Sequence, residues 1–232
     1  RTRRQRRISL SAQAHHAGHD QQITRHCRGL TMIELSPLQN DALCEIFNIS
    51  VGQAASTLSQ IVNEEIVLSV PEIKFYTVRE AGDYLSHSSN RICGIWQTFD
   101  GYFNGNALLI FPEVRSLELV RLMMGKNLPI EQLTELEQDA LSEIGNIILN
   151  SCLASLSDLF DHPFQCGLPR LHIGSGQSTL KECDAENIVM ILEIQFSIES
   201  KKIDGYVVFV MNTESLDLLA KAIDQFFGAI PA

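Results

Sequence analysis

The stretch DALCEIFN at residues 41–48 returns almost unchanged as DALSEIGN at residues 139–146, 98 residues further along the chain. Further identities at the same offset pair Leu38 with Leu136, Ser59 with Ser157, and Pro71 with Pro169. Self-similarity at a fixed offset indicates that one structural unit occurs twice. We therefore predict two internal repeats, at residues 32–129 and 130–232.

Each predicted repeat begins with a signal for the start of a helix. Ser36 precedes a proline, and Gln39 stands where a capping box requires it. Thr134 and Glu137 form the corresponding pair in the second repeat. Apolar residues then follow helical spacing to about Val62 and Phe160, so each repeat should open with a long helix.

The pattern after each long helix is that of strands. Segments 66–78, 91–99 and 105–111 in the first repeat are rich in β-branched and aromatic residues, as are 168–174, 187–198 and 204–211 in the second. Closing helices are expected at 113–124 and 214–227. The stretch GSGQS at 174–178 lacks the pattern of a phosphate-binding loop, so we interpret it as a turn. The prediction is an α+β fold with helices packed on an antiparallel sheet.

Charge divides the chain at about Met32. Residues 1–31 carry seven Arg and a single acid, whereas the rest carries 11 Lys or Arg against 27 Asp or Glu, a net charge of −16. The basic segment has few apolar residues, so we expect a disordered tail that lies upstream of the natural start or was added to it. An arm for nucleic acid or a targeting peptide is the alternative.

The composition of the acidic body excludes several classes of protein. Its net charge should repel nucleic acid and anionic lipid, which favours a protein partner with a basic patch. No apolar run approaches the roughly 18 residues of a transmembrane helix. The six cysteines are scattered without metal-binding spacing, which is typical of a reducing cytoplasm.

The repeated stretch places polar residues on one face of each long helix. Steps of four and three residues align the sets Asp41, Glu45, Asn48 and Asp139, Glu143, Asn146. Neither Glu nor Asn is a strong nucleophile. A carboxylate can pair with a lysine of a partner, and a carboxamide can orient a water molecule, as in phosphoryl hydrolysis. The stripes therefore indicate docking onto a phosphorylated partner.

The spacing Asp-x3-Glu-x2-Asn-x22-Pro occurs twice in full, ending at Pro71 and Pro169. This pattern resembles the signature of the CheC, CheX and FliY family of bacterial chemotaxis phosphatases, and two motifs in about 200 residues resemble its CheC-type form. The resemblance implies a cytoplasmic hydrolase of two-component signalling that removes phosphate from the aspartate of a CheY-like response regulator. It also implies that Mg²⁺ belongs to the phosphorylated partner, with no cofactor of the chain's own.

The resemblance assigns roles by motif position. Glu45 and Glu143 would dock to the receiver, Asn48 and Asn146 would position the attacking water, and Asp41, Asp139, Pro71 and Pro169 would support the motif. It also suggests CheD as a further partner. Two alternatives remain: an adaptor of the same fold that binds receivers or CheD without turnover, and a metal enzyme that uses the acidic stripes.

One difference separates the two motifs. Phe47 precedes Asn48, whereas Gly145 precedes Asn146. A bulky Phe47 could block insertion of Asn48 into a narrow phosphate pocket, or it could be buried if the helix rotates slightly. We therefore expect the second motif to contribute more than the first.

Overall fold

The computed structural model describes residues 35–123, 135–198 and 201–228. All described elements belong to one compact unit, Leu35–Ala232. The predicted basic tail at 1–31 and the predicted cap at Thr134 lie outside the described residues.

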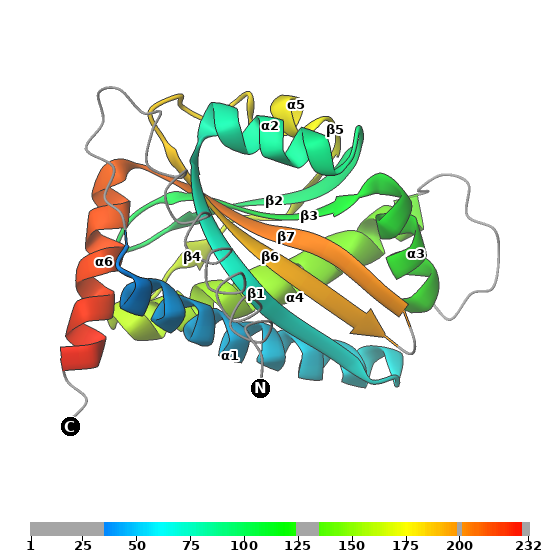
Figure 1. Cartoon of the computed structure of the whole chain (residues 1–232). Helices are drawn as coiled ribbons and strands as arrows, with labels where there is room; N and C mark the ends of the chain where they lie inside the picture. The colour runs from blue at the N-terminus through cyan, green and yellow to red at the C-terminus, as the bar shows by residue number, and fades with distance from the viewer. Residues whose placement is uncertain (1–34, 124–134, 199–200, 229–232) are drawn as a thin grey trace, which may run out of the picture. The chain divides into compact units, whose positions relative to one another are not determined.

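A seven-stranded antiparallel sheet forms the centre of this unit (Figure 1). Its order is β1-β6-β7-β3-β2-β4, and β5 also pairs with β2. The strands are β1 (Ile66–Thr77), β2 (Ile92–Asp100), β3 (Gly105–Pro112), β4 (Gln165–Cys166), β5 (Arg170–Gly174), β6 (Ile188–Ile198) and β7 (Lys201–Met211). The first strand after each long helix, β1 or β4, pairs with a strand from the other half of the chain, so both halves contribute to one sheet.

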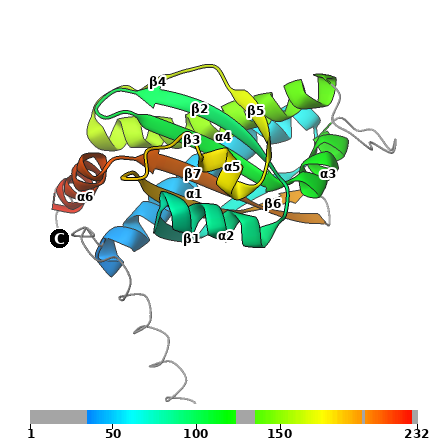
Figure 2. The same cartoon turned by 90° about the horizontal axis from the view of Figure 1, so that it is seen from above.

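Helices cover both faces of the sheet. The described helices are α1 (Pro37–Val62), α2 (Val78–Ser88), α3 (Glu113–Met123), α4 (Glu135–Phe160), α5 (Gly176–Leu180) and α6 (Thr213–Gly228). The long α1 and α4 lie on one face, and α2 and α5 lie over the other (Figures 1 and 2). The predicted α+β class, with helices packed on antiparallel strands, is confirmed.

The sequence analysis did not anticipate α2 and α5. A capping box formed by Thr77 and Glu80 begins α2, and this signal was present in the sequence. The stretch GSGQS, interpreted as a turn, instead contains the start of α5, where the Ser175 side chain accepts a hydrogen bond from the backbone of Ser178. The prediction of a turn was therefore wrong at this point.

Equivalent hydrogen bonds recur 98 residues apart at the ends of the long helices. The Ser59 hydroxyl accepts the amide of Ile66 at 2.9 Å, and the Ser157 hydroxyl accepts the amide of Phe164 at 3.2 Å. The residue after each helix is left-handed, Asn63 with φ 57° and Asp161 with φ 50°. The connection from helix to strand therefore has the same local structure after both long helices.

Candidate functional site

The predicted polar stripes lie on neighbouring helices. We call Asp41, Glu45 and Asn48 on α1 the first site, and Asp139, Glu143 and Asn146 on α4 the second site. In both, the two carboxylates are exposed and the asparagine is half-buried. The helices contact each other, and the Ser50 hydroxyl on α1 donates to that of Ser155 on α4 at 2.5 Å. Both stripes thus have the exposure that docking requires.

In the first site, the Asn48 carboxamide is bound at both ends to the backbone of β1. Asn48 Oδ1 accepts the amide of Val70 at 2.8 Å, and Nδ2 donates to the carbonyl of Val70 at 3.2 Å. Val70 lies in a β-bulge, because the register with β6 shifts by one residue between Ser69 and Glu72. Asn48 therefore satisfies backbone groups that the ladder leaves unpaired there.

In the second site, Asn146 is bound to side chains rather than to a strand backbone. Its Oδ1 accepts from Asn150 Nδ2 at 2.8 Å and from Gln97 Nε2 at 3.4 Å. Gln97 Nε2 also lies 2.9 Å from the carbonyl of Gly167 and 3.3 Å from Asn150 Oδ1. The sequence analysis missed Gln97 and Asn150. A glutamine on the inward face of an otherwise apolar strand was the available signal for Gln97.

A bulge is present near the second site as well, but its central side chain points to solvent and not into the core. Between Cys166 and Arg170 the chain gains one residue relative to β2. Here Leu168 is 87% exposed, whereas Val70, its counterpart in the first bulge, is 2% exposed. The bulge residue therefore packs inward beside the first site and outward beside the second.

The motif prolines lie at these two bulges. Pro71 is inside β1 rather than at its entrance, and it falls within the register shift. Pro169 immediately precedes β5. A proline cannot donate to a ladder, so it is compatible with a bulge or a strand end.

The difference between Phe47 and Gly145 concerns the distance between helix and sheet. Phe47 is fully buried and stacks on Phe209 of β7 with ring centroids 5.6 Å apart, so its side chain does not cover Asn48. Of the two alternatives considered for Phe47, the structure shows burial. A Cβ atom on Gly145 would lie 2.5 Å from the side chain of Ile95, which shows that α4 lies against β2 at this point.

Cys44 lies between the acids of the first site. Burial raises the pKa of its thiol, and the charges of Asp41 and Glu72 raise it further, against a lowering hydrogen bond from the backbone of Ile73. The thiolate is therefore disfavoured at neutral pH, which argues against a cysteine nucleophile here. In the second site Ser142 takes this position, and its hydroxyl donates to the carbonyl of Gln138 at 2.9 Å.

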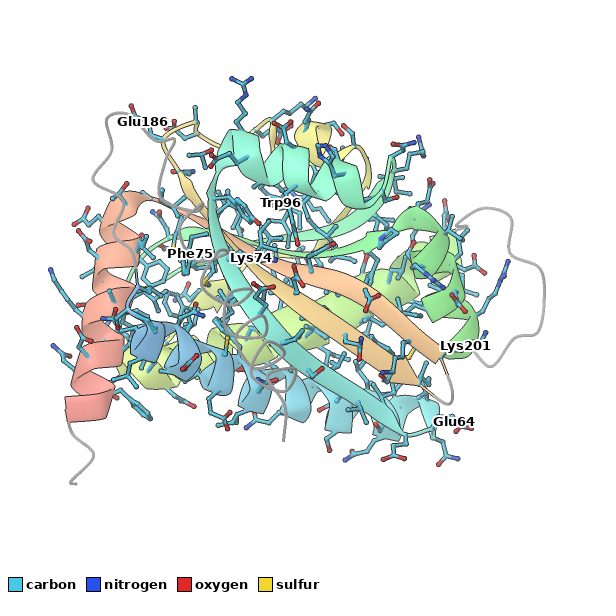
Figure 3. All side chains as sticks on the ribbon, viewed as in Figure 1. Glu64, Lys74, Phe75, Trp96, Glu186 and Lys201 are labelled. Carbon is cyan, nitrogen blue, oxygen red and sulfur yellow. The ribbon has the colours of Figure 1, made fainter. Side chains whose placement is uncertain are left out.

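A second polar cluster lies on the opposite face of the sheet, under α2. Lys74 of β1, labelled in Figure 3, is 2.8 Å from Glu72 and 2.9 Å from Glu193, and the Tyr84 hydroxyl also donates to Glu193. Partial burial raises the pKa of Glu193, but the hydrogen bonds from Tyr84 and Lys74 lower it overall. The cluster therefore links the edge strand β1 and the helix α2 to β6 through Glu193.

Within residues 35–123, 135–198 and 201–228, no group of three or more His, Cys, Asp or Glu side chains is arranged to hold a metal ion. No helix in those ranges is both long and apolar enough to cross a membrane.

The sequence and the fold are similar to those of known chemotaxis and flagellar proteins. Residues 38–75 match the model of the CheC-like family. The chain is 32% identical over 124 residues to the CheY-P phosphatase CheC of Bacillus subtilis (strain 168), an alignment that covers 52% of this chain and 59% of that protein. The matched region thus spans little more than half of the relative.

Two solved structures share the fold. FliY of Thermotoga maritima aligns with a TM-score of 0.69 at 23% identity, covering 82% of this chain and 98% of that one. The FliM middle domain from H. pylori aligns with a TM-score of 0.62 at 12% identity, covering 81% and 99%. The family-model match, the CheC relative and the shared fold together confirm the resemblance of this chain to the CheC-like family.

Proposed function

We propose that the chain is a phosphatase that removes phosphate from the aspartate of a CheY-like receiver domain in chemotaxis signalling. The observation that carries this proposal is the second site. There the exposed carboxylate of Glu143 lies about one helical turn from the carboxamide of Asn146, whose oxygen accepts hydrogen bonds from Gln97 and Asn150. The similarity to a CheY-P phosphatase supports the same reaction.

Each residue of the second site has a role in this reaction. Glu143 would pair with a lysine of the receiver, because an exposed carboxylate forms charge-assisted hydrogen bonds with an ammonium group. Asn146 would then lie beside the phosphoryl group and hold a water molecule in line for attack. The first site offers the same pair in Glu45 and Asn48.

The chemistry needs orientation more than a reactive group on this chain. The water oxygen forms a bond to phosphorus while the bond from phosphorus to the aspartate oxygen breaks, and the carboxylate leaves with the electron pair. A proton of the water passes to solvent or to the released phosphate. Such transfers depend mainly on alignment and charge stabilisation, and Mg²⁺ on the receiver would supply most of the latter.

We further propose that 32–129 and 130–232 are two copies of one unit. The equivalent hydrogen bonds of Ser59 and Ser157 and the paired bulges at Val70 and Leu168 support this duplication. Pro71 and Pro169 would then support the motif by shaping the two bulges. Duplication accounts for the presence of two candidate sites on one surface.

An adaptor that binds a CheY-like receiver or CheD without turnover is the second candidate. The observation in its favour is that both ends of the Asn48 carboxamide are already bound to Val70. These two bonds fix the Asn48 side chain to the strand backbone and leave one lone pair on Oδ1 and one hydrogen on Nδ2 for other partners.

The test is a phosphate-release assay with a phosphorylated receiver loaded with Mg²⁺. Replacing Asn48 and Asn146 together by Ala should reduce the acceleration over the receiver's own rate by about 10- to 100-fold, equivalent to about 1.4–2.7 kcal/mol of barrier. The exposed Asn90→Ala serves as a control. Unchanged acceleration in the double variant would exclude the proposed role, and stoichiometric binding without acceleration would favour the adaptor.

The same assay addresses the metal-enzyme alternative. The chain is first treated with EDTA and freed of the chelator, and Mg²⁺ is then supplied bound to the receiver alone. Retained activity is expected, whereas a loss that only added metal restores would support a metal site on this chain.

A further inference from the structure

We infer that Gln97 is a positioning residue that sets the direction of the Asn146 carboxamide in the second site. The inference deepens the proposed function and rests on it for the catalytic part. Gln97 lies on β2, on the face covered by α4, and is 1% exposed. It is one of few buried polar side chains among the described residues, and its amide nitrogen lies among three acceptors.

The carbonyl of Gly167 fixes which end of Gln97 points toward α4. A backbone carbonyl can only accept a hydrogen bond, so the Gln97 atom 2.9 Å from it must be the nitrogen. The nitrogen has one further hydrogen, which its two other contacts share, so both must be acceptors: Oδ1 of Asn146 and Oδ1 of Asn150. The direction of the whole carboxamide chain therefore follows from one backbone group.

Asn150 completes the same arrangement. With its oxygen toward Gln97, its nitrogen faces Asn146 and donates to Oδ1 at 2.8 Å. The Asn146 oxygen thus accepts from Asn150 at 2.8 Å and, over a longer contact, from Gln97 at 3.4 Å. Within the described part of the chain, Asn146 Nδ2 donates to no protein acceptor, so it is the end that can hold a water molecule.

The oxygen end of Gln97 has no partner within the part of the chain that the structure describes. Gln97 Oε1 is buried, and no donor among the described residues reaches it. An unsatisfied buried acceptor is destabilising, and an apolar side chain of similar size would remove it. Gln97 therefore costs stability at its oxygen, while its nitrogen pairs the Gly167 carbonyl and contacts both asparagines of α4.

Gln195 provides a control, because it lies two residues after Glu193 on β6 and is therefore on the face of the sheet opposite to Gln97. It is half-buried on β6 and donates to Asp204 at 3.3 Å. The first site instead binds Asn48 through the backbone of Val70. Gln195→Met is thus a matched control that removes a glutamine carboxamide from the sheet and leaves the second site intact.

The direct test does not depend on activity. In ¹⁵N-labelled protein, the side-chain amide signals of Asn146 are identified by their loss in Asn146→Ala. Gln97→Met should shift or broaden these signals, and Gln195→Met should leave them in place. Unchanged Asn146 signals in folded Gln97→Met would overturn the inference. If Gln97→Met does not fold, Gln97→Asn, which is one methylene shorter, makes the same test.

The kinetic test uses Asn48→Ala as background, so that only the second site contributes. Gln97→Met should lower kcat by about 3- to 10-fold and leave KM within about 2-fold, because misorientation affects the transition state more than binding. Combined with Asn146→Ala, it should have no further effect on kcat, since the two residues act as one unit.

The outcomes separate the two proposals. A multiplicative loss of kcat in the combined variant would overturn the positioning role of Gln97 even if Asn146→Ala alone is strongly impaired. If Asn146→Ala has no effect on phosphate release, the proposed function fails, and the Asn146 amide signals still decide whether Gln97 orients that side chain.

Discussion

The first and second sites use the same asparagine in different ways. Asn48 is held at both ends by the backbone of Val70, whereas Asn146 is held at its oxygen by Gln97 and Asn150. The motif and its helix are equivalent in the two places. The residues of the sheet that contact the asparagine differ between the two sites. The role of a motif residue therefore depends on neighbours that the motif does not include.

The difference extends to the packing around each site. Phe47 fills the space between α1 and the sheet, while Gly145 allows α4 to lie against Ile95. Val70 packs inward at its bulge and Leu168 points outward. We interpret the first arrangement as structural and the second as prepared for a ligand.

The largest effect is expected from removing the aromatic ring of Phe47, which separates α1 from the sheet beside the first site. Phe47→Ala should lower the free energy of unfolding by about 3–5 kcal/mol, because it opens a cavity against Phe209. Denaturant unfolding measures this value. Ile49→Ala on the same helix, at a residue 56% exposed, is the control and should change it little. A loss below about 1 kcal/mol for Phe47→Ala would contradict the spacer role.

The next effect concerns the two hydrogen bonds between Asn48 and the backbone of Val70. Asn48→Ala should cost about 1–3 kcal/mol of stability, because it leaves the buried amide and carbonyl of Val70 without partners. Asn146→Ala should cost less than about 1 kcal/mol, since Gln97 keeps the Gly167 carbonyl as acceptor. Equal losses in thermal or denaturant unfolding would remove the distinction between the two sites.

Two glycines allow the helix–sheet distance to be tested. Alanine in place of glycine within a helix normally stabilises by about 0.5–1 kcal/mol, and Gly52→Ala should do so, because nothing lies within 4 Å of its added Cβ. Gly145→Ala should instead destabilise by about 1–3 kcal/mol, since the Cβ would meet Ile95 at 2.5 Å. Stabilisation by Gly145→Ala would show that α4 is not pressed against β2.

The smallest effect is expected at the outward bulge residue. Leu168→Ser should change the free energy of unfolding by less than about 0.5 kcal/mol, because the side chain is almost fully exposed. Val70→Ser should lose roughly 1.5–3 kcal/mol of apolar burial. Similar losses at the two positions would mean that the bulges do not differ in solution.

Much of this architecture could be predicted from local signals. Ser36 and Gln39 mark the start of α1, and helical spacing locates the ends of both long helices at Val62 and Phe160. Exposure of the acidic residues also followed from the helical period. Such features depend on neighbouring residues, which a sequence displays directly.

The features that distinguish the two sites depend on contacts between distant residues. Gln97 lies 49 residues before Asn146, and the fold brings them together only through the packing of α4 on β2. The short α5 was missed because its residues are mostly Gly, Ser and Thr, which favour turns when judged by propensity. The inward Val70 and outward Leu168 are both apolar, so their different placement could not be seen in the sequence.

The most direct test compares the two asparagines in one assay. Phosphate release from a Mg²⁺-loaded, phosphorylated receiver is measured with Asn48→Ala and Asn146→Ala separately, at equal concentrations of folded protein. We predict a loss of about 10- to 100-fold for Asn146→Ala and less than about 2-fold for Asn48→Ala. A loss for Asn48→Ala equal to or larger than that for Asn146→Ala would contradict the account.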